Sequence, residues 1–141
     1  IGDLNGMPEK TRNALLSGIR ETSSNKRMQL NLALNYSSRW EILEAAKKIA
    51  SDALSAQFNK EINEEYFSSL LSTKDIPDPD LLIRTSGEQR ISNFLLWQLA
   101  YTELYFTDVL WPDFRKEQLY KAILDYQSRE RRFGMISEQL L

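Results

Sequence analysis

Two arginines and a serine lie close together in one polar segment of the sequence. Arg84 follows a short apolar run, Arg90 comes six residues later, and Ser92 two residues after that. Guanidinium groups bind phosphate oxygens in a bidentate manner, and a hydroxyl can donate a further hydrogen bond to the same anion. Residues 84–93, in which Gly87 would let the chain bend, are therefore a candidate site for a small, multiply charged anion.

The same residues also have a plainer interpretation. Glu88 lies between the two arginines, and surface ion pairs of this kind are common and contribute little to stability. An anion site and a set of surface ion pairs are both open for Arg84 and Arg90. Glu103 is open in the same way. It lies among apolar and aromatic residues, where a carboxylate either binds a metal or a proton, or is exposed on a half-buried element.

The composition limits what other chemistry the chain can perform. Its 141 residues include no Cys and no His. Disulfides, thiolate zinc sites, a cysteine nucleophile and a Ser-His-Asp triad are therefore excluded within the chain. The remaining carboxylates, guanidinium groups, hydroxyls and amides suit Mg²⁺ and phosphate esters. The formal net charge of −2 lacks the positive excess of a typical nucleic-acid-binding protein, so we expect no nucleic-acid partner.

Five stretches of the sequence are predicted to form α-helices, mostly from the helical spacing of apolar residues. Pro8 is well placed as the first residue of the first helix. Ser38 and Glu41 have the spacing of a capping box at the start of the second helix. The predicted helices cover residues 8–22, 38–55, 64–71, 94–100 and 116–131.

Three stretches are predicted to form strands. Strict alternation of apolar and polar residues favours a strand over 28–35. Residues 81–83 have the short apolar run of a buried parallel strand, and 104–109 are rich in strand-forming residues. Strands that alternate with helices predict an α/β fold, with a mostly parallel sheet flanked by helices. Ligands of such sheets bind beyond the carboxyl ends of the strands, where Arg84 is expected.

The candidate loop and the residues after it closely resemble the cis-prenyltransferase family, and among its members the bacterial undecaprenyl diphosphate synthases. The resemblance covers nearly the whole chain in order and includes several uncommon motifs. It is carried by residues 80–88, 90–98, 101–106 and 111–114, and it continues in residues 1–3, 30–33, 36–42 and 129–134.

This resemblance implies a synthase that extends an allylic diphosphate with isopentenyl diphosphate units, creates a cis double bond at each addition and needs Mg²⁺. For the bacterial members, farnesyl diphosphate would be extended to undecaprenyl diphosphate, the lipid carrier of cell-wall precursors. By the resemblance, Arg84, Arg90 and Ser92 hold the diphosphate of isopentenyl diphosphate, and Glu103 belongs to the Mg²⁺ environment.

The end of the chain adds an expected partner. Arg132 and Gly134 match the family's Arg-X-Gly motif, which helps to complete the diphosphate site of a neighbouring subunit, so a homodimer is expected. No apolar run approaches the ~20 residues that span a bilayer, and no signal peptide is visible. A cytoplasmic protein is therefore expected, with peripheral contact at the inner face of the membrane for a lipid product. Residues 115–134 are rich in basic residues, which fits such contact or simply a solvated helix face.

The chain also departs from the family pattern. The family's amino-terminal Asp-Gly-Asn motif, whose aspartate anchors Mg²⁺ and the allylic diphosphate, has no match, and residues 3–6 are only a superficial echo of it. Residues 1–141 are thus expected to be the carboxy-terminal portion of a single domain, without a catalytic residue and inactive alone. Ser37 and Ser38 replace a Gly-Gly pair, a variant we expect to be tolerated.

A non-catalytic partner subunit is the alternative interpretation. Partner subunits in this family stabilise or complete a catalytic chain, and they tend to lose the residues that bind diphosphate. Arg84, Arg90 and Ser92 are all present here, which favours the enzyme.

Overall fold

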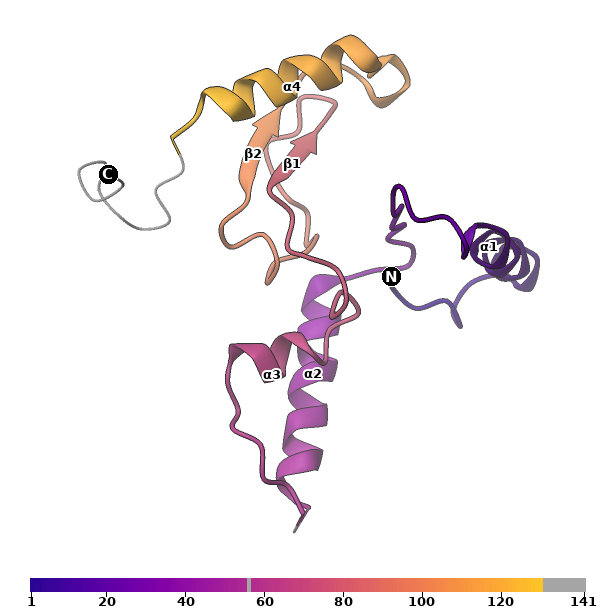
Figure 1. Cartoon of the computed structure of the whole chain (residues 1–141), viewed down its shortest axis with the longest axis vertical. Helices are drawn as coiled ribbons and strands as arrows, with labels where there is room; N and C mark the ends of the chain where they lie inside the picture. Colours follow the sequence, from indigo (N-terminus) through magenta and orange to yellow (C-terminus); the bar gives the residue numbers. More distant parts are fainter. Residues whose placement is uncertain (56, 131–141) are drawn as a thin grey trace. The chain divides into compact units, whose positions relative to one another are not determined.

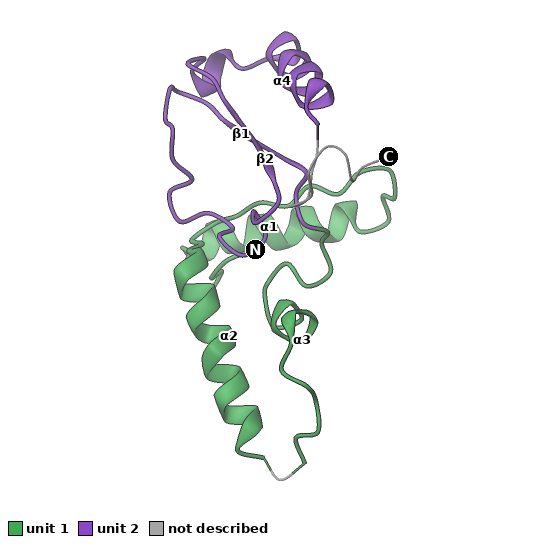
Figure 2. Cartoon of the chain, turned by 90° about the vertical axis from the view of Figure 1, so that its left-hand side faces the viewer, with its two compact units in different colours: residues 1–77 green, residues 78–141 purple. Residues whose placement is uncertain are grey.

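Helices occupy the first half of the chain, and a small parallel sheet occupies the second (Figure 1). The computed structural model describes residues 1–55 and 57–130. The chain consists of two compact units, residues 1–77 and residues 78–141 (Figure 2). The elements are α1 (Glu9–Thr22), α2 (Ser38–Ala53), α3 (Glu64–Ser68), β1 (Leu81–Arg84), β2 (Glu103–Phe106), the 3₁₀ turn η1 (Trp111–Asp113) and α4 (Lys116–Ser128).

The first unit is organised around α2, which begins one residue earlier than a capping box at Ser38 requires. Ser37 is the N-cap, and its hydroxyl accepts a hydrogen bond from Trp40 N at 3.4 Å. The predicted box is therefore wrong, because Ser38 is already the first helical residue and is fully buried. Pro8 likewise stands just before α1 as its N-cap, with extended backbone angles, and not within the helix.

Glu41 does not act in the predicted capping box but accepts hydrogen bonds from residues outside α2. Its side chain is buried and accepts hydrogen bonds from Tyr36 Oη at 2.6 Å and Ser72 N at 2.8 Å, with a further short contact from Ser72 Oγ. A buried carboxylate is costly unless such donors surround it. These bonds therefore tie α2 both to the chain before it and to the segment after α3.

The strand predicted over 28–35 is not formed. Ile1 N donates to Leu32 O at 2.8 Å and Leu34 N donates to Ile1 O at 3.0 Å, which is the pattern of one parallel bridge. Gly2, at φ +106°, then breaks the register. Alternating residues form a strand only where a neighbouring backbone supplies a ladder, and Leu30 remains 74% exposed here.

The second unit is built on two parallel strands. Leu81 of β1 pairs with Glu103 of β2, and Arg84 pairs with Phe106. Helix α4 contacts β2, and its Ala122 is fully buried. Thr102 Oγ1 donates to Pro79 O at 2.6 Å, which fixes the start of both strands. The predicted α/β class with a parallel sheet and flanking helices is confirmed.

The helix predicted over 94–100 is wrong, because the segment forms consecutive turns. Two residues just before it and one within it have left-handed backbone angles: Ser92 at φ 48°, Asn93 at φ 62° and Leu95 at φ 47°. Left-handed residues cannot continue a right-handed helix. None of the helices within residues 1–55 and 57–130 combines the length and the apolar character needed to cross a bilayer.

Substitution of Glu41 by Ala should lower the free energy of unfolding by about 1–3 kcal/mol, because it removes the acceptor of the partly buried hydrogen bonds from Tyr36 and Ser72. Glu44→Ala is the matched control on the same helix, since Glu44 only pairs with Lys47 at the surface, and it should cost under about 0.5 kcal/mol. Chemical denaturation followed by circular dichroism measures both. Equal losses would show that Glu41 is not a central link.

Asp52 and Tyr66 give a second, pH-dependent prediction. Tyr66 Oη donates to Asp52 Oδ2 at 2.7 Å, and this bond raises the pKa of Tyr66 above its usual value. Because the folded-state pKa is raised, the contribution of Tyr66 to stability is present below pH 10 and is lost as the pH rises through the folded pKa. Site-resolved NMR titration should show the pKa of Tyr66 falling in Asp52→Asn. An unchanged pKa would contradict the bond.

Candidate functional site

The loop of residues 84–93 leaves the carboxyl end of β1 and is fastened at its start to the chain beyond β2. Three backbone hydrogen bonds make this attachment: Thr107 N to Arg84 O at 2.9 Å, Ser86 N to Val109 O at 2.9 Å, and Gly87 N to Thr107 O at 3.0 Å. These bonds extend the pairing of the two strands past their ends. The backbone at Arg84, from which the side chain projects, is therefore held in place.

The sharp turn in this loop depends on Gly87. Ser86 and Gly87 are consecutive left-handed residues, at φ 71° and 68°. A Cβ atom on Gly87 would lie 3.0 Å from Asp108 Oδ1, which is tighter than ordinary contact. The predicted bending role of Gly87 is therefore confirmed.

The side chains of the predicted anion site differ in their surroundings. Arg84 is half-buried, and Ser92 is exposed. Arg90 is 65% exposed and forms an ion pair with Glu88, which is the surface pairing that the sequence left open. Such an exposed pair is weak, so a more highly charged anion could replace Glu88. A role in substrate binding stays a prediction for all three residues.

An apolar cavity of about 330 Å³ lies beside Arg84. It lies between β1 and the turns that follow the loop, and Arg84 is one of its lining residues. Its lining residues are Pro79, Leu81, Leu82, Ile83, Arg84, Ile91, Phe94, Leu95 and Leu99. A cavity of this kind suits a ligand with one charged and one small apolar part.

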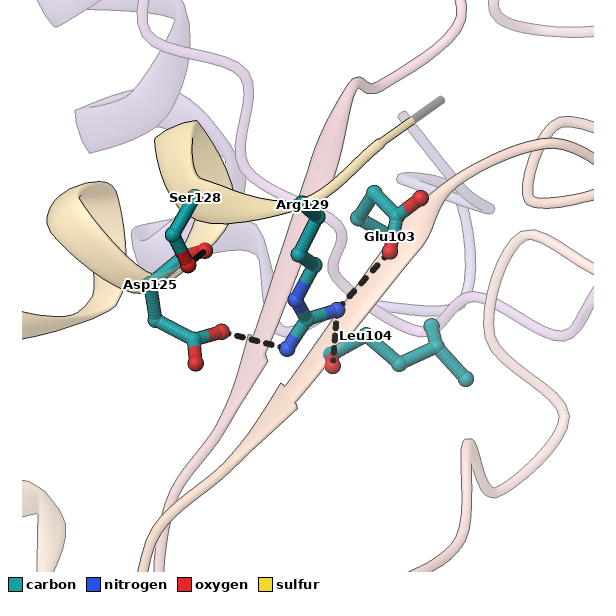
Figure 3. A network of polar contacts seen from close by, with 5 residues as sticks. All are labelled: Glu103, Leu104, Asp125, Ser128 and Arg129. Carbon is teal, nitrogen blue, oxygen red and sulfur yellow. Dashed lines mark hydrogen bonds and ion pairs between the residues drawn. The ribbon is translucent and has the colours of Figure 1, made fainter. Parts of the chain in front are cut away.

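Glu103 belongs to a second group of polar residues, which sequence analysis did not recognise (Figure 3). Arg129 Nη1 donates to Glu103 Oε2 at 2.8 Å and to Leu104 O at 3.0 Å. Its other terminal nitrogen, Nη2, donates to Asp125 Oδ2 at 2.5 Å. The hydrogen bond to Glu103, followed by that to Asp125, raises the pKa of Arg129 above its ordinary value.

The register of the sheet separates this group from the candidate loop. Glu103 pairs with Leu81, whereas Arg84 pairs with Phe106, so they lie about 10 Å apart along the strands. Successive side chains of a strand point to opposite faces, which puts Glu103 and Arg84 on different faces of the sheet. The structure thus does not bring the predicted metal residue to the predicted anion site.

Glu103 meets the requirements of a Mg²⁺ site only in part. Its carboxylate is the correct ligand class, and Mg²⁺ at phosphate sites often uses one or two carboxylates together with phosphates and waters. Across the described part of the chain, no group of three or more Asp, Glu, His or Cys residues is arranged to hold a metal ion. Glu103 therefore fits as one donor of a larger set. Arg132 and Gly134 lie outside the described residues.

The comparisons with known proteins agree with the resemblance found in the sequence. The family model for undecaprenyl diphosphate synthase matches residues 1–134. An isoprenyl transferase of Porphyromonas gingivalis is 55% identical over 99% of this chain and 56% of its own length. An isoprenyl transferase of Geobacillus kaustophilus is 54% identical over 97% of this chain and 54% of its own length.

Two solved structures are also similar. A lavandulyl diphosphate synthase from Lavandula x intermedia, in complex with dimethylallyl diphosphate, has a TM-score of 0.88 and 43% identity over 95% of this chain and 58% of its own. A probable undecaprenyl diphosphate synthase from Campylobacter jejuni has a TM-score of 0.80 and 36% identity, covering 95% and 61%. The chain spans about half the length of the curated relatives. It belongs to the undecaprenyl diphosphate synthase family of prenyltransferases.

Proposed function

We propose that the protein domain completed by this chain extends an allylic diphosphate with isopentenyl diphosphate and forms a cis double bond at each addition. The relatives named isoprenyl transferase support this activity. The observation that carries it in the structure is the position of Arg84, at the carboxyl end of β1 and beside an apolar cavity. Isopentenyl diphosphate has two parts that match these features: a diphosphate anion for the arginine and a five-carbon apolar group for the cavity.

In this proposal the loop binds the diphosphate of isopentenyl diphosphate. Arg84 and Arg90 supply guanidinium groups and Ser92 a hydroxyl. Arg90 exchanges its ion pair with Glu88 for the more highly charged ligand. The cavity beside Arg84 takes the apolar part, so the charged end fixes the direction in which the reacting double bond points.

The reaction then needs positioning and charge stabilisation rather than a nucleophilic side chain. The allylic carbon–oxygen bond breaks, the diphosphate group leaves with the bonding electrons, and the electrons of the isopentenyl double bond form the new bond to the allylic carbon. Loss of a proton restores a double bond. Bound Mg²⁺ would neutralise the charge of the leaving diphosphate. The carboxylate of Glu103, which lies away from the 84–93 loop, would be one ligand of that ion. This chain holds the substrate that attacks.

The family membership also supports a more specific proposal. We propose farnesyl diphosphate as the starting allylic substrate and undecaprenyl diphosphate as the product, in agreement with the matched family model and the Campylobacter jejuni neighbour. We further propose a homodimer, in which Arg132 and Gly134 complete the neighbouring subunit's diphosphate site. The enzyme would act in the cytoplasm and deliver its lipid product at the inner face of the membrane.

Arg90→Ala should raise the KM for isopentenyl diphosphate by at least about 30-fold, because one guanidinium contact with a diphosphate is worth about 2 kcal/mol or more. The KM for the allylic diphosphate should change little. Steady-state kinetics would use the full family domain, with the remaining part supplied by the Porphyromonas gingivalis relative. Arg115→Ala, which removes an exposed arginine at the start of α4, is the matched control. Equal losses for both substrates would contradict the assignment, and a domain that binds but never transfers would favour the partner subunit.

Glu103→Gln should change the Mg²⁺ dependence of the same domain while leaving the KM for isopentenyl diphosphate near its original value, because Glu103 is remote from the loop. We expect about a tenfold higher Mg²⁺ concentration at half-maximal rate. Glu117→Gln removes an exposed carboxylate of α4 and serves as the control. An unaltered Mg²⁺ titration would remove Glu103 from the metal environment.

A further inference from the structure

We propose that Arg129 is a positioning residue that fixes the carboxylate of Glu103 for its part in the Mg²⁺ environment. This inference rests on the proposed function, because that function gives Glu103 its metal. Neither the composition nor the motifs of the sequence assigned Arg129 a task.

The contacts of Arg129 join two elements of the second unit. Arg129 is the C-cap of α4, and Glu103 and Leu104 are the first two residues of β2. One nitrogen of the guanidinium group bridges the Glu103 carboxylate and the Leu104 carbonyl, and the other binds Asp125 in the last turn of α4. A planar fork with several fixed donors can make these contacts together, whereas the single ammonium of a lysine cannot reproduce their directions.

This arrangement leaves Glu103 oriented and still attractive to a cation. Its Oε2 faces Arg129, and its other carboxylate oxygen points away from the guanidinium group (Figure 3). Two carboxylates share one guanidinium, so the three side chains together carry a formal charge of −1. If Arg129 paired with Glu103 alone, the pair would have no net charge. Here Arg129 limits the rotation of the carboxylate and leaves the trio negative.

Arg129 also differs from the arginines proposed to bind substrate. Its side chain is 30% exposed, compared with 65% for Arg90. It lies with Glu103 at the end of the strands remote from Arg84. Its guanidinium group is already engaged by Glu103 and Asp125 within the protein. Residues that hydrogen-bond to a metal-binding side chain commonly set the orientation of that side chain.

The test is a double-mutant cycle with Arg129→Gln, Glu103→Gln and both together, in the full family domain completed from the Porphyromonas gingivalis relative. If Arg129 acts through Glu103, each single variant should raise the Mg²⁺ concentration at half-maximal rate about tenfold, and the double variant should be no worse than Glu103→Gln. The KM for isopentenyl diphosphate should stay near its original value. Lys121→Gln removes an exposed charge of α4 and should change neither quantity.

Three results would overturn the proposal: losses that multiply in the double variant, an unchanged Mg²⁺ dependence in Arg129→Gln despite a lower melting temperature, or a rise confined to the KM for isopentenyl diphosphate. If the unaltered domain shows no transfer, the proposed function fails, and thermal unfolding decides the positioning contact. Melting-temperature losses smaller than additive in the double variant support it, and additive losses overturn it.

Discussion

The parallel pairing of β1 with β2 is the constraint on which the candidate site depends. Four residues of each strand are paired, and the ladder continues into the loop through backbone bonds to Thr107 and Val109. This pairing fixes Arg84 at one end of the sheet and Glu103 at the other. Helix α4 then packs against β2 and brings Arg129 to Glu103. A slip of one residue would turn the side chains of one strand to the opposite face and disrupt this arrangement.

Local patterns predicted most of the helices correctly, because the information for a helix lies within a few turns. α1, α2 and α4 lie within one to three residues of their predicted bounds. The wrong predictions concern segments whose structure depends on the backbone conformation of neighbouring residues. Residues 28–35 alternate, but beside them lie a few residues at the start of the chain, Ile1 and Asp3, and not a full strand. Residues 94–100 follow left-handed residues that no apolar pattern reveals. Ser37 is the cap in place of Ser38, and Glu41 makes tertiary hydrogen bonds instead of capping bonds.

The candidate loop could be found from its sequence because its arginines, serine and glycine lie within ten residues. The Arg129 group could not, since Arg129 and Glu103 are 26 residues apart and only the docking of α4 on β2 joins them. The separation of Glu103 from Arg84 was also invisible, because it follows from strand register. The family resemblance implied roles for these residues, whereas the structure shows only their positions, with Arg84 and Glu103 at different ends of one sheet.

We propose that the loop after β1 binds isopentenyl diphosphate, while Arg129 orients Glu103 at the other end of the strands. NMR of the completed domain with labelled arginine side chains tests this most directly, during titration with isopentenyl diphosphate and Mg²⁺. We expect saturable shifts of the Arg84 and Arg90 guanidinium signals with isopentenyl diphosphate, and a response of the Arg129 signal to Mg²⁺ alone. Shifts of Arg129 with isopentenyl diphosphate, and none of Arg84 and Arg90, would contradict it.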